Sequence, residues 1–279
     1  MMASSSQSSS SKASSSQSSS NNEKVHPVRV PVPSGFNHSI YIDKNDPRFL
    51  IKSLSKPSST KAMIDGYIVV GFPKSRMVLK GKYTMHIDGS YIGKLRGGFG
   101  VVIRNSDRKL VAALYGCSTA IFPDDPQAKR ANYHELEAAF YGFLFCGRLN
   151  IACRDVQLIT DCKAVVQIFD DKECIPNFGK DVETLCERFT NELGFEGHFK
   201  YNIHHGAKHV YRQANWPADS LSKLGMYCEE SGEIYPADIE DGNPKREQYG
   251  PFVYFLERDE FGDPYVRDTS EGNASDDEV

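Results

Sequence analysis

The stretch Tyr83–Ser90 constrains the fold most, because it combines the pattern of a buried strand with a carboxylate. Met85 and Ile87 alternate with polar residues, as residues of a strand inside a sheet do. Asp88 follows and stands next to a Gly-Ser pair. Strand interiors disfavour Asp, and a buried acid is costly unless it is paired or bound to a metal. Asp88 is therefore either the first residue of a β-turn or an acid kept for its chemistry.

Two further strands are expected directly after this one. Residues 97–104 carry Val-Val-Ile after a glycine-rich start, residues 105–108 read as a turn, and residues 109–116 form a third apolar stretch. Consecutive strands joined by short turns form an antiparallel meander. The middle of the chain is therefore expected to begin with a three-stranded antiparallel unit.

The apolar spacing changes to that of a helix after the meander. Apolar residues recur at helical spacing over 132–149, with Asn132 as the expected N-cap and Glu135 in the first turn. Two more strands are expected, over 155–160 and 198–204, and three more helices, near 165–169, 182–193 and 214–224. This order predicts an α/β fold with a five-stranded mixed sheet, a three-strand antiparallel meander plus two parallel strands, flanked by helices on both faces.

Four acids fall within or at the ends of these elements: Asp88, Glu135, Asp161 and Asp219. If the first and fourth strands are neighbours, Asp88 and Asp161 lie side by side, and two helices can bring in the other acids. Clustered carboxylates repel one another and raise each other's pKa values, so they fit a site for divalent cations. Hard oxygen ligands suit Mg²⁺ or Mn²⁺, and two such ions about 4 Å apart can clamp a phosphodiester during cleavage.

Four sequence blocks resemble, in order and spacing, the signature blocks of type 1 ribonuclease H. They are Met85–Ser90, Asn132–Ala138, Ile159–Asp161 and Arg212–Lys223. The last block carries Arg-x-Ala-Asn-x-x-Ala-Asp-x-Leu, which is similar to the plant, reverse-transcriptase-like branch of that family. The resemblance covers about residues 80–226, and each block holds one of the four acids.

The resemblance implies a two-metal endonuclease that cuts the RNA strand of an RNA:DNA hybrid, with two Mg²⁺ ions, or Mn²⁺ in their place. Asp88, Glu135, Asp161 and Asp219 would be the metal ligands. Substrate contacts are implied at Gly89, Ser90, Asn132, Lys163 and Asn215. Asn132 matches a family position in the minor groove of the hybrid, where contacts to the 2′-OH distinguish RNA from DNA. Lys163 stands where many members have a polar amide.

A mobile cation near Asp219 is implied as an aid to product release, and two residues could supply it. Arg212, seven residues before Asp219, matches a position used by members with a short loop; its alternative is a phosphate contact or a surface salt bridge. His209, ten residues before Asp219, matches the loop histidine of bacterial members; its alternative is simple packing near Tyr211.

Two other functions are weighed against the hybrid nuclease. One is a module that keeps the fold and the acids but binds nucleic acid or protein with little turnover, which the short loop near His209 favours. The other is a different nuclease of the same superfold, such as a 3′–5′ exonuclease, which the Asn-x-x-Ala-Asp-x-Leu ending disfavours.

The charge divides the 279 residues into three parts, because residues 1–81 carry about +7, residues 82–226 about +1 and residues 227–279 about −12. We expect a disordered Ser-rich tail over 1–24, which has little to bury. A Pro-containing basic extension follows over 25–79, with a short strand near 64–72, and then the ribonuclease H-like domain over 80–226. Residues 227–279 are expected to be an acidic extension, partly disordered, whose aromatic stretch 249–255 docks on the domain as a strand or binds a protein partner.

The seven cysteines are scattered without a CxxC pair, so neither a zinc site nor a disulfide framework is indicated and a reducing compartment is expected. No apolar run approaches the roughly 20 residues of a membrane span, and a soluble protein is expected. We expect a monomer in the nucleus or cytoplasm. A plastid transit peptide is the alternative interpretation of the tail, which lacks acids before Glu23.

Overall fold

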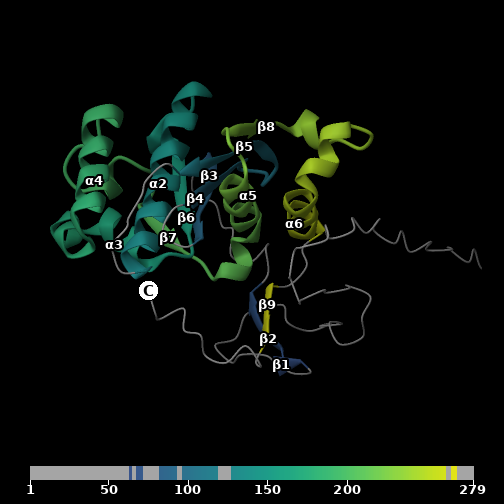
Figure 1. The fold of residues 1–279 in the computed structure, drawn as a ribbon, viewed down its shortest axis with the longest axis horizontal. Helices are drawn as coiled ribbons and strands as arrows, with labels where there is room; N and C mark the ends of the chain where they lie inside the picture. The colour runs from purple at the N-terminus through teal and green to yellow at the C-terminus, as the bar shows by residue number, and fades with distance from the viewer. Residues whose placement is uncertain are drawn as a thin grey trace, which may run out of the picture.

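The computed structural model describes residues 63–64, 67–71, 82–92, 96–118, 127–261 and 265–268. The expected Ser-rich tail and most of the basic extension lie outside these residues. The described part forms one large mixed sheet with helices on both faces and a separate small sheet (Figure 1).

The large sheet has the strand order β7-β6-β3-β4-β5-β8. Strands β3 (Tyr83–Ile92), β4 (Arg96–Asn105) and β5 (Leu110–Ser118) form the expected antiparallel meander, while β6 (Val156–Thr160) and β7 (Ala207–His209) are parallel to β3. The expected fold class is therefore confirmed. The sheet has six strands rather than five, because β8 (Gly232–Ile234) pairs antiparallel with the outer side of β5.

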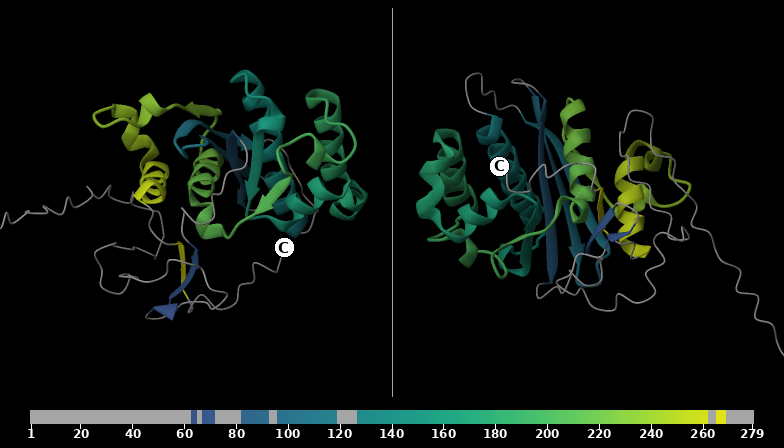
Figure 2. Two further views of the ribbon diagram at one scale, coloured as in Figure 1. Left: turned by 180° about the vertical axis from the view of Figure 1, so that it is seen from behind. Right: turned by 90° about the horizontal axis from the view of Figure 1, so that it is seen from below.

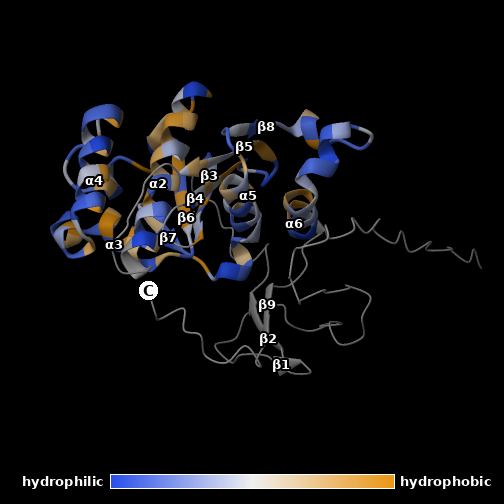
Figure 3. Ribbon diagram, viewed as in Figure 1, coloured by the Kyte–Doolittle hydropathy of each residue, from blue (hydrophilic) through white to orange (hydrophobic). Residues whose placement is uncertain are grey.

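Helices cover both faces of this sheet, which Figure 2 shows edge-on between them. One face carries α2 (Gln127–Arg148), α3 (Lys163–Asp170) and α4 (Lys180–Leu193), and its core contains Phe140, Phe143 and Phe189. The other face carries α5 (Trp216–Tyr227) and α6 (Gly250–Phe261) over Val102 and Ala113. Hydrophobic residues follow α2 and the strands beneath it (Figure 3). Burying these apolar surfaces stabilises the three-layer arrangement.

Short 3₁₀ helices join several of these elements. They are Cys153–Asp155, Lys172–Phe178, Phe199–Tyr201, Arg212–Ala214, Pro236–Ile239 and Pro244–Tyr249. No helix in the described ranges is long and apolar enough to cross a membrane.

Two expected boundaries near the acids are wrong. Helix α2 begins at Gln127, so Asn132 lies inside the helix rather than at its N-cap, and Glu135 lies beyond the first turn. The residues before Asn132 include good helix formers, which extend the helix towards the N-terminus. Strand β3 does not turn at the Gly-Ser pair, because its pairing with β4 continues to Ile92, which is opposite Arg96. Asp88 is therefore an interior strand residue.

The prediction of a strand over 198–204 is also wrong. That stretch contains a 3₁₀ turn, Phe199–Tyr201, and the strand at this edge, β7, begins at Ala207. His205 and Gly206 have positive φ angles of 54° and 71°, so the chain turns there before it joins the sheet. Alternation of apolar and polar residues alone did not locate this turn.

The aromatic stretch 249–255 is mostly helical rather than a strand, and it packs against the domain. The Trp216 and Phe255 rings have centroids 5.1 Å apart, which joins α5 to α6. Arg104 of β4 donates a 2.8 Å hydrogen bond to the carboxylate of Asp259, and both side chains are buried. Residues 232–256 thus add the edge strand β8 to the large sheet and pack helix α6 on one of its faces.

A second, three-stranded sheet has the order β1-β2-β9. Strands β1 (Met63–Ile64) and β2 (Tyr67–Gly71) fall in the basic extension, and β2 pairs antiparallel with β9 (Tyr265–Asp268). A strand was expected near 64–72, but its partner could not be identified from sequence. The partner lies in the acidic C-terminal segment.

Candidate metal centre

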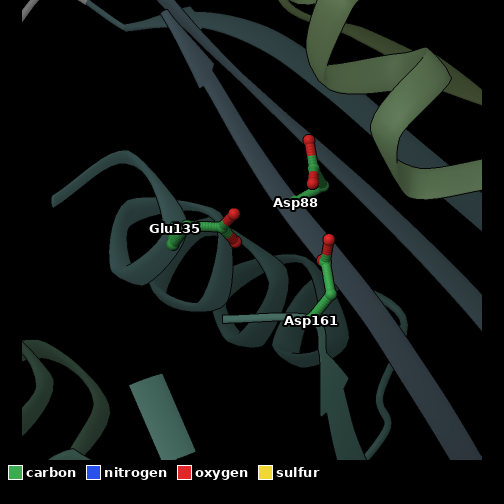
Figure 4. A group of neighbouring side chains, drawn as sticks. All are labelled: Asp88, Glu135 and Asp161. Carbon is green, nitrogen blue, oxygen red and sulfur yellow. The ribbon is translucent and has the colours of Figure 1, made fainter. Parts of the chain in front are cut away.

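Three of the four acids bring their carboxylates together where β6 ends beside the middle of β3. Asp88 comes from β3, Glu135 from α2 and Asp161 from the residue after β6, and Figure 4 shows their side chains converging. One oxygen from each lies within 4.8 Å of the others. The parallel pairing of β3 with β6, in which His86 is opposite Ile159, places Asp88 and Asp161 on adjacent strands. This is the neighbourhood expected of the first and fourth strands.

Glu135 reaches this group because Gly89 allows α2 to lie directly against β3. A Cβ atom on Gly89 would be 2.2 Å from the backbone carbon of His134 and 2.3 Å from the nitrogen of Glu135. No side chain fits in that space. Gly97 has a similar role, since its Cβ would be 2.3 Å from the His134 ring, which is hydrogen-bonded to Glu137 at 3.2 Å.

Hydroxyl groups hold Asp88 in place from the opposite side. Ser222 of α5 donates a short hydrogen bond to Asp88 Oδ2, and Ser90 Oγ lies 3.4 Å from the same oxygen. The two hydroxyls are 2.7 Å apart. Gly98 and Gly100 bring α5 this close, because Cβ atoms on them would be 2.4 Å and 2.5 Å from backbone atoms of Ser222.

Asn215 holds Asp161 in the same manner. Its side-chain nitrogen donates to Asp161 Oδ1 at 2.6 Å and to the carbonyl oxygen of Ile87 at 2.7 Å. Asn215 is completely buried, so its amide is used to orient an acid. His209 Nε2 donates to the carbonyl oxygen of Asp161 at 3.1 Å, which places this histidine beside Asp161.

Asp219, the fourth acid, is engaged by cations of the chain itself. Arg212 Nη2 donates to its Oδ1 at 2.9 Å, and Lys223 Nζ donates to its Oδ2 at 2.6 Å. The carboxylate is only 1% exposed, whereas the side chains of Arg212 and Lys223 are 58% and 29% exposed. Asp219 is thus outside the group of three acids whose oxygens lie within 4.8 Å.

The electrostatics differ between the group of three acids and Asp219. Burial, and then the charges of the neighbouring acids, raise the pKa values of Asp88 and Glu135 well above the usual range. Burial is also the main reason that the pKa of Asp161 is raised. Burial alone would raise the pKa of Asp219, but Lys223 and Arg212 outweigh it, so this pKa is lowered.

The group of three acids fits a divalent cation. Glu135 Oε2 is buried and has no hydrogen-bond partner among the described residues, and the carboxylates repel one another. A hard cation would satisfy that oxygen and remove the repulsion. Asp88, Glu135 and Asp161 are the residues that could hold it.

Other expected site residues surround this centre. Asn132 is buried on α2, and its side-chain oxygen accepts a 3.7 Å hydrogen bond from the Cys162 thiol, next to Asp161. Lys163 is the first residue of α3. Sequence reasoning assigned no role to Ser222 or Lys223. Their positions three and four residues after Asp219 on a helix were the available signal, because such residues share one helix face.

We expect Ser222→Ala to weaken Mn²⁺ binding about tenfold, because residues that orient a metal ligand commonly contribute that much. The substitution removes the hydrogen bond to Asp88 and leaves helix α5 unchanged. Ser220→Ala is the matched control, since the buried Ser220 hydroxyl donates to the carbonyl of Pro217 instead of to an acid. Titration calorimetry with Mn²⁺ measures both variants, and equal affinities would contradict a role for Ser222.

Comparisons with known proteins find similar structures but no similar family or curated sequence. No protein-family model matches the chain, and no curated protein does. RNase H1 of the archaeon Halobacterium salinarum is 18% identical, with a TM-score of 0.39, over 52% of this chain and 97% of that one. LC11-RNase H1, solved in complex with an RNA/DNA hybrid, is 19% identical, with a TM-score of 0.37, over 52% and 96%.

The N-terminal RNase H domain of a Mycobacterium tuberculosis protein is 17% identical, with a TM-score of 0.35, over 53% of this chain and 94% of that one. At such identities, neither an activity nor a set of site residues passes from these proteins to this chain.

Proposed function

We propose that the protein is a divalent-cation-dependent endonuclease that cleaves the RNA strand of RNA:DNA hybrids. The observation that carries the proposal is the group of Asp88, Glu135 and Asp161, whose oxygens lie within 4.8 Å of one another. The four sequence blocks that resemble type 1 ribonuclease H supply the substrate class. Two Mg²⁺ ions, or Mn²⁺ in their place, are the proposed cofactors.

Different residues of the chain would bind the metal ions and orient the metal ligands in such a reaction. Bound divalent ions would activate a water molecule and stabilise the leaving oxygen of the phosphodiester. Asp88, Glu135 and Asp161 would hold the first ion and Asp219 would help to hold the second, while Ser222 and Asn215 keep Asp88 and Asp161 in fixed orientations. Fixed ligands reduce the reorganisation that the reaction requires.

The residues around the acids supply the proposed substrate contacts. Ser90, Asn132 and Lys163 come from β3, α2 and α3, and Asn132 is proposed to contact the minor groove and its 2′-OH groups. The basic residues of the extension 25–79 are proposed to add phosphate contacts, because residues 82–226 are nearly neutral. An intracellular monomer remains our proposal for its state in the cell.

The test is cleavage of labelled RNA:DNA, RNA:RNA and DNA:DNA duplexes by the full chain, with Mg²⁺, with Mn²⁺ and with a chelator. We expect internal cuts in the RNA strand of the hybrid only, and only with a divalent ion. Cation-independent cleavage, or equal cleavage of all three duplexes, would reject the proposal.

The second candidate is a binding module with the same fold and little turnover. The observation that favours it is the pair of cations on Asp219, since Arg212 and Lys223 occupy both oxygens of this acid. This candidate predicts hybrid binding in gel-shift experiments without cleavage under either metal. The duplex experiment therefore separates the two functions.

Arg212→Ala is expected to lower turnover about tenfold, which corresponds to about 1.4 kcal/mol in the barrier. Arg212 bonds to Asp219 and its side chain is largely exposed, so it can follow a departing phosphate. His209→Ala is expected to do much less, because His209 bonds to a backbone carbonyl. Single-turnover and steady-state rates of both variants measure the difference.

The pH dependence of turnover gives a second way to distinguish the roles of Arg212 and His209. Arginine keeps its proton at working pH, whereas histidine titrates near neutrality. The loss caused by Arg212→Ala should therefore be the same from about pH 6 to about pH 8. Arg188→Ala, which breaks the exposed Arg188–Glu192 pair on α4, is the control for removal of an arginine. A larger and pH-dependent loss for His209→Ala would reverse the assignment.

A further inference from the structure

Both carboxylate oxygens of Asp219 are bonded to side chains that carry a positive charge. Lys223, four residues later on the same helix, contacts Oδ2 at 2.6 Å, and Arg212 contacts Oδ1 at 2.9 Å. The acid itself is buried, and the two cations reach it from the more exposed side. A divalent ion at Asp219 must therefore displace at least one of them.

The other three acids keep oxygens that no ion pair occupies in the described structure. The short hydrogen bond to Asp88 engages Oδ2, the bond from Asn215 engages Oδ1 of Asp161, and Glu135 Oε2 has no partner. A first divalent ion can bind here without breaking an ion pair. The two parts of the site thus differ in what must be displaced before a cation enters.

Lys223 is the cation that can leave more easily. Arg212, although its side chain is 58% exposed, is attracted by Asp219 and also by Asp88 and Asp161, and these charges raise its pKa. Lys223 contacts Asp219 through the end of a flexible, unbranched side chain. An ammonium group is a compact charge that can transfer from one anion to another without a fixed planar geometry.

We propose that Lys223 is a counter-ion that blocks cation binding at Asp219 until a nucleic-acid phosphate draws its ammonium group away. The proposal rests on the proposed function for the identity of the phosphate. Free of nucleic acid, the chain then binds one divalent ion at Asp88, Glu135 and Asp161. A second ion binds only when a backbone phosphate beside α5 takes over Lys223, so that the full metal site assembles on substrate.

The test measures Mn²⁺ binding to the full chain without nucleic acid, by titration calorimetry and by electron paramagnetic resonance of free Mn²⁺. The wild type should bind one ion. Lys223→Met removes the charge but keeps the length of the side chain, and should bind two ions over the same range of Mn²⁺ concentrations. Lys223→Arg keeps the charge and should behave as the wild type.

Lys180→Met is the matched control, because it breaks the exposed Lys180–Glu183 pair on α4, on the other face of the sheet. Circular dichroism checks that each variant is folded, and Lys223→Gln replaces Lys223→Met if the latter is not. A second ion in the wild type, or an unchanged count in the Lys223→Met and Lys223→Gln variants, would overturn the proposal.

The result is independent of the proposed nuclease activity. If Lys223→Met gains one Mn²⁺ ion while the wild type cleaves no hybrid, the counter-ion proposal is supported and the nuclease proposal is rejected. Cleavage by the wild type together with an unchanged Mn²⁺ count would do the reverse. Absence of Mn²⁺ binding in every variant would reject both.

Discussion

Asp88→Asn is expected to reduce cleavage of an RNA:DNA hybrid roughly a thousandfold, about 4 kcal/mol in the barrier. The substitution preserves the shape of the side chain and an oxygen that can accept the Ser222 hydrogen bond, but it removes a negative charge from the centre of the site. Rates with saturating Mg²⁺ and Mn²⁺ measure the loss. A rate within a few-fold of the wild type would show that Asp88 does not bind the metal.

The same variant should be more stable than the wild type in the absence of metal. Burial, Asp219 and Asp161 raise the pKa of Asp88 in the folded protein, so the folded wild type holds a proton that the unfolded chain has released. Wild-type stability therefore falls as pH rises from the ordinary carboxyl pKa to the raised one. The amide introduced by Asp88→Asn cannot ionise, so this part of the fall should disappear from thermal melts recorded across that pH range.

Asp155→Asn is the control for both measurements. Asp155 is an aspartate near the opposite end of β3, where its carboxylate forms a partly exposed 3.0 Å ion pair with Lys82. Removing such a pair costs little. Unchanged cleavage and a nearly unchanged melting temperature are expected for this variant.

Gly89→Ala is expected to destabilise the protein by about 1–3 kcal/mol, since one added methyl group overpacks a tight contact. The methyl carbon would lie 2.2 Å from the backbone of His134, and backbone atoms cannot move aside as the end of a side chain can. Helix α2 must shift, and Glu135 moves with it. A displacement of about 1 Å at a catalytic group can cost a hundredfold in rate, and we expect a loss of that order.

Chemical denaturation and hybrid cleavage measure the two effects of Gly89→Ala. The control is Gly147→Ala near the end of the same helix, where an added Cβ meets nothing within 4 Å. That variant should be slightly more stable, because alanine favours a helix over glycine by roughly 0.5–1 kcal/mol. If Gly89→Ala is as stable and active as the wild type, the close approach of α2 to β3 is not required.

Sequence patterns located most of the elements because their causes are local. The helical spacing of residues 182–193 reflects one buried face, and α4 follows it closely. The alternation of apolar and polar residues over 83–87 located β3, although both faces of this strand are buried from Thr84 to Asp88. The start of α2 depends on small differences in helix propensity, which one sequence does not resolve to a residue. Residues 249–255 carried aromatic residues that suit a strand, but packing against α5 and β4 made them mostly helical.

The candidate site could be predicted in part for a related reason. The acids occupy defined elements, so the topology alone brings Asp88 next to Asp161. The ion pair between Arg212 and Asp219 depends on the path of residues 210–215, which is a tertiary property, whereas Lys223 lies four residues after Asp219 on one helix and its ion pair is local. The hydrogen bond from Ser222 to Asp88 joins residues that are far apart in the sequence, so no local pattern predicts it.

The pairing of β2 with β9 has a consequence for the order of folding. Tyr67 is opposite Asp268, so these two strands can meet only after almost all of the intervening chain has been synthesised. The large sheet separates them in sequence and can form earlier, because its meander is local. Closing so long a loop in an unfolded chain carries a large entropy cost, which a folded domain between the strands reduces. Pairing of β2 with β9 is therefore expected late in folding, after the domain between the two strands has formed.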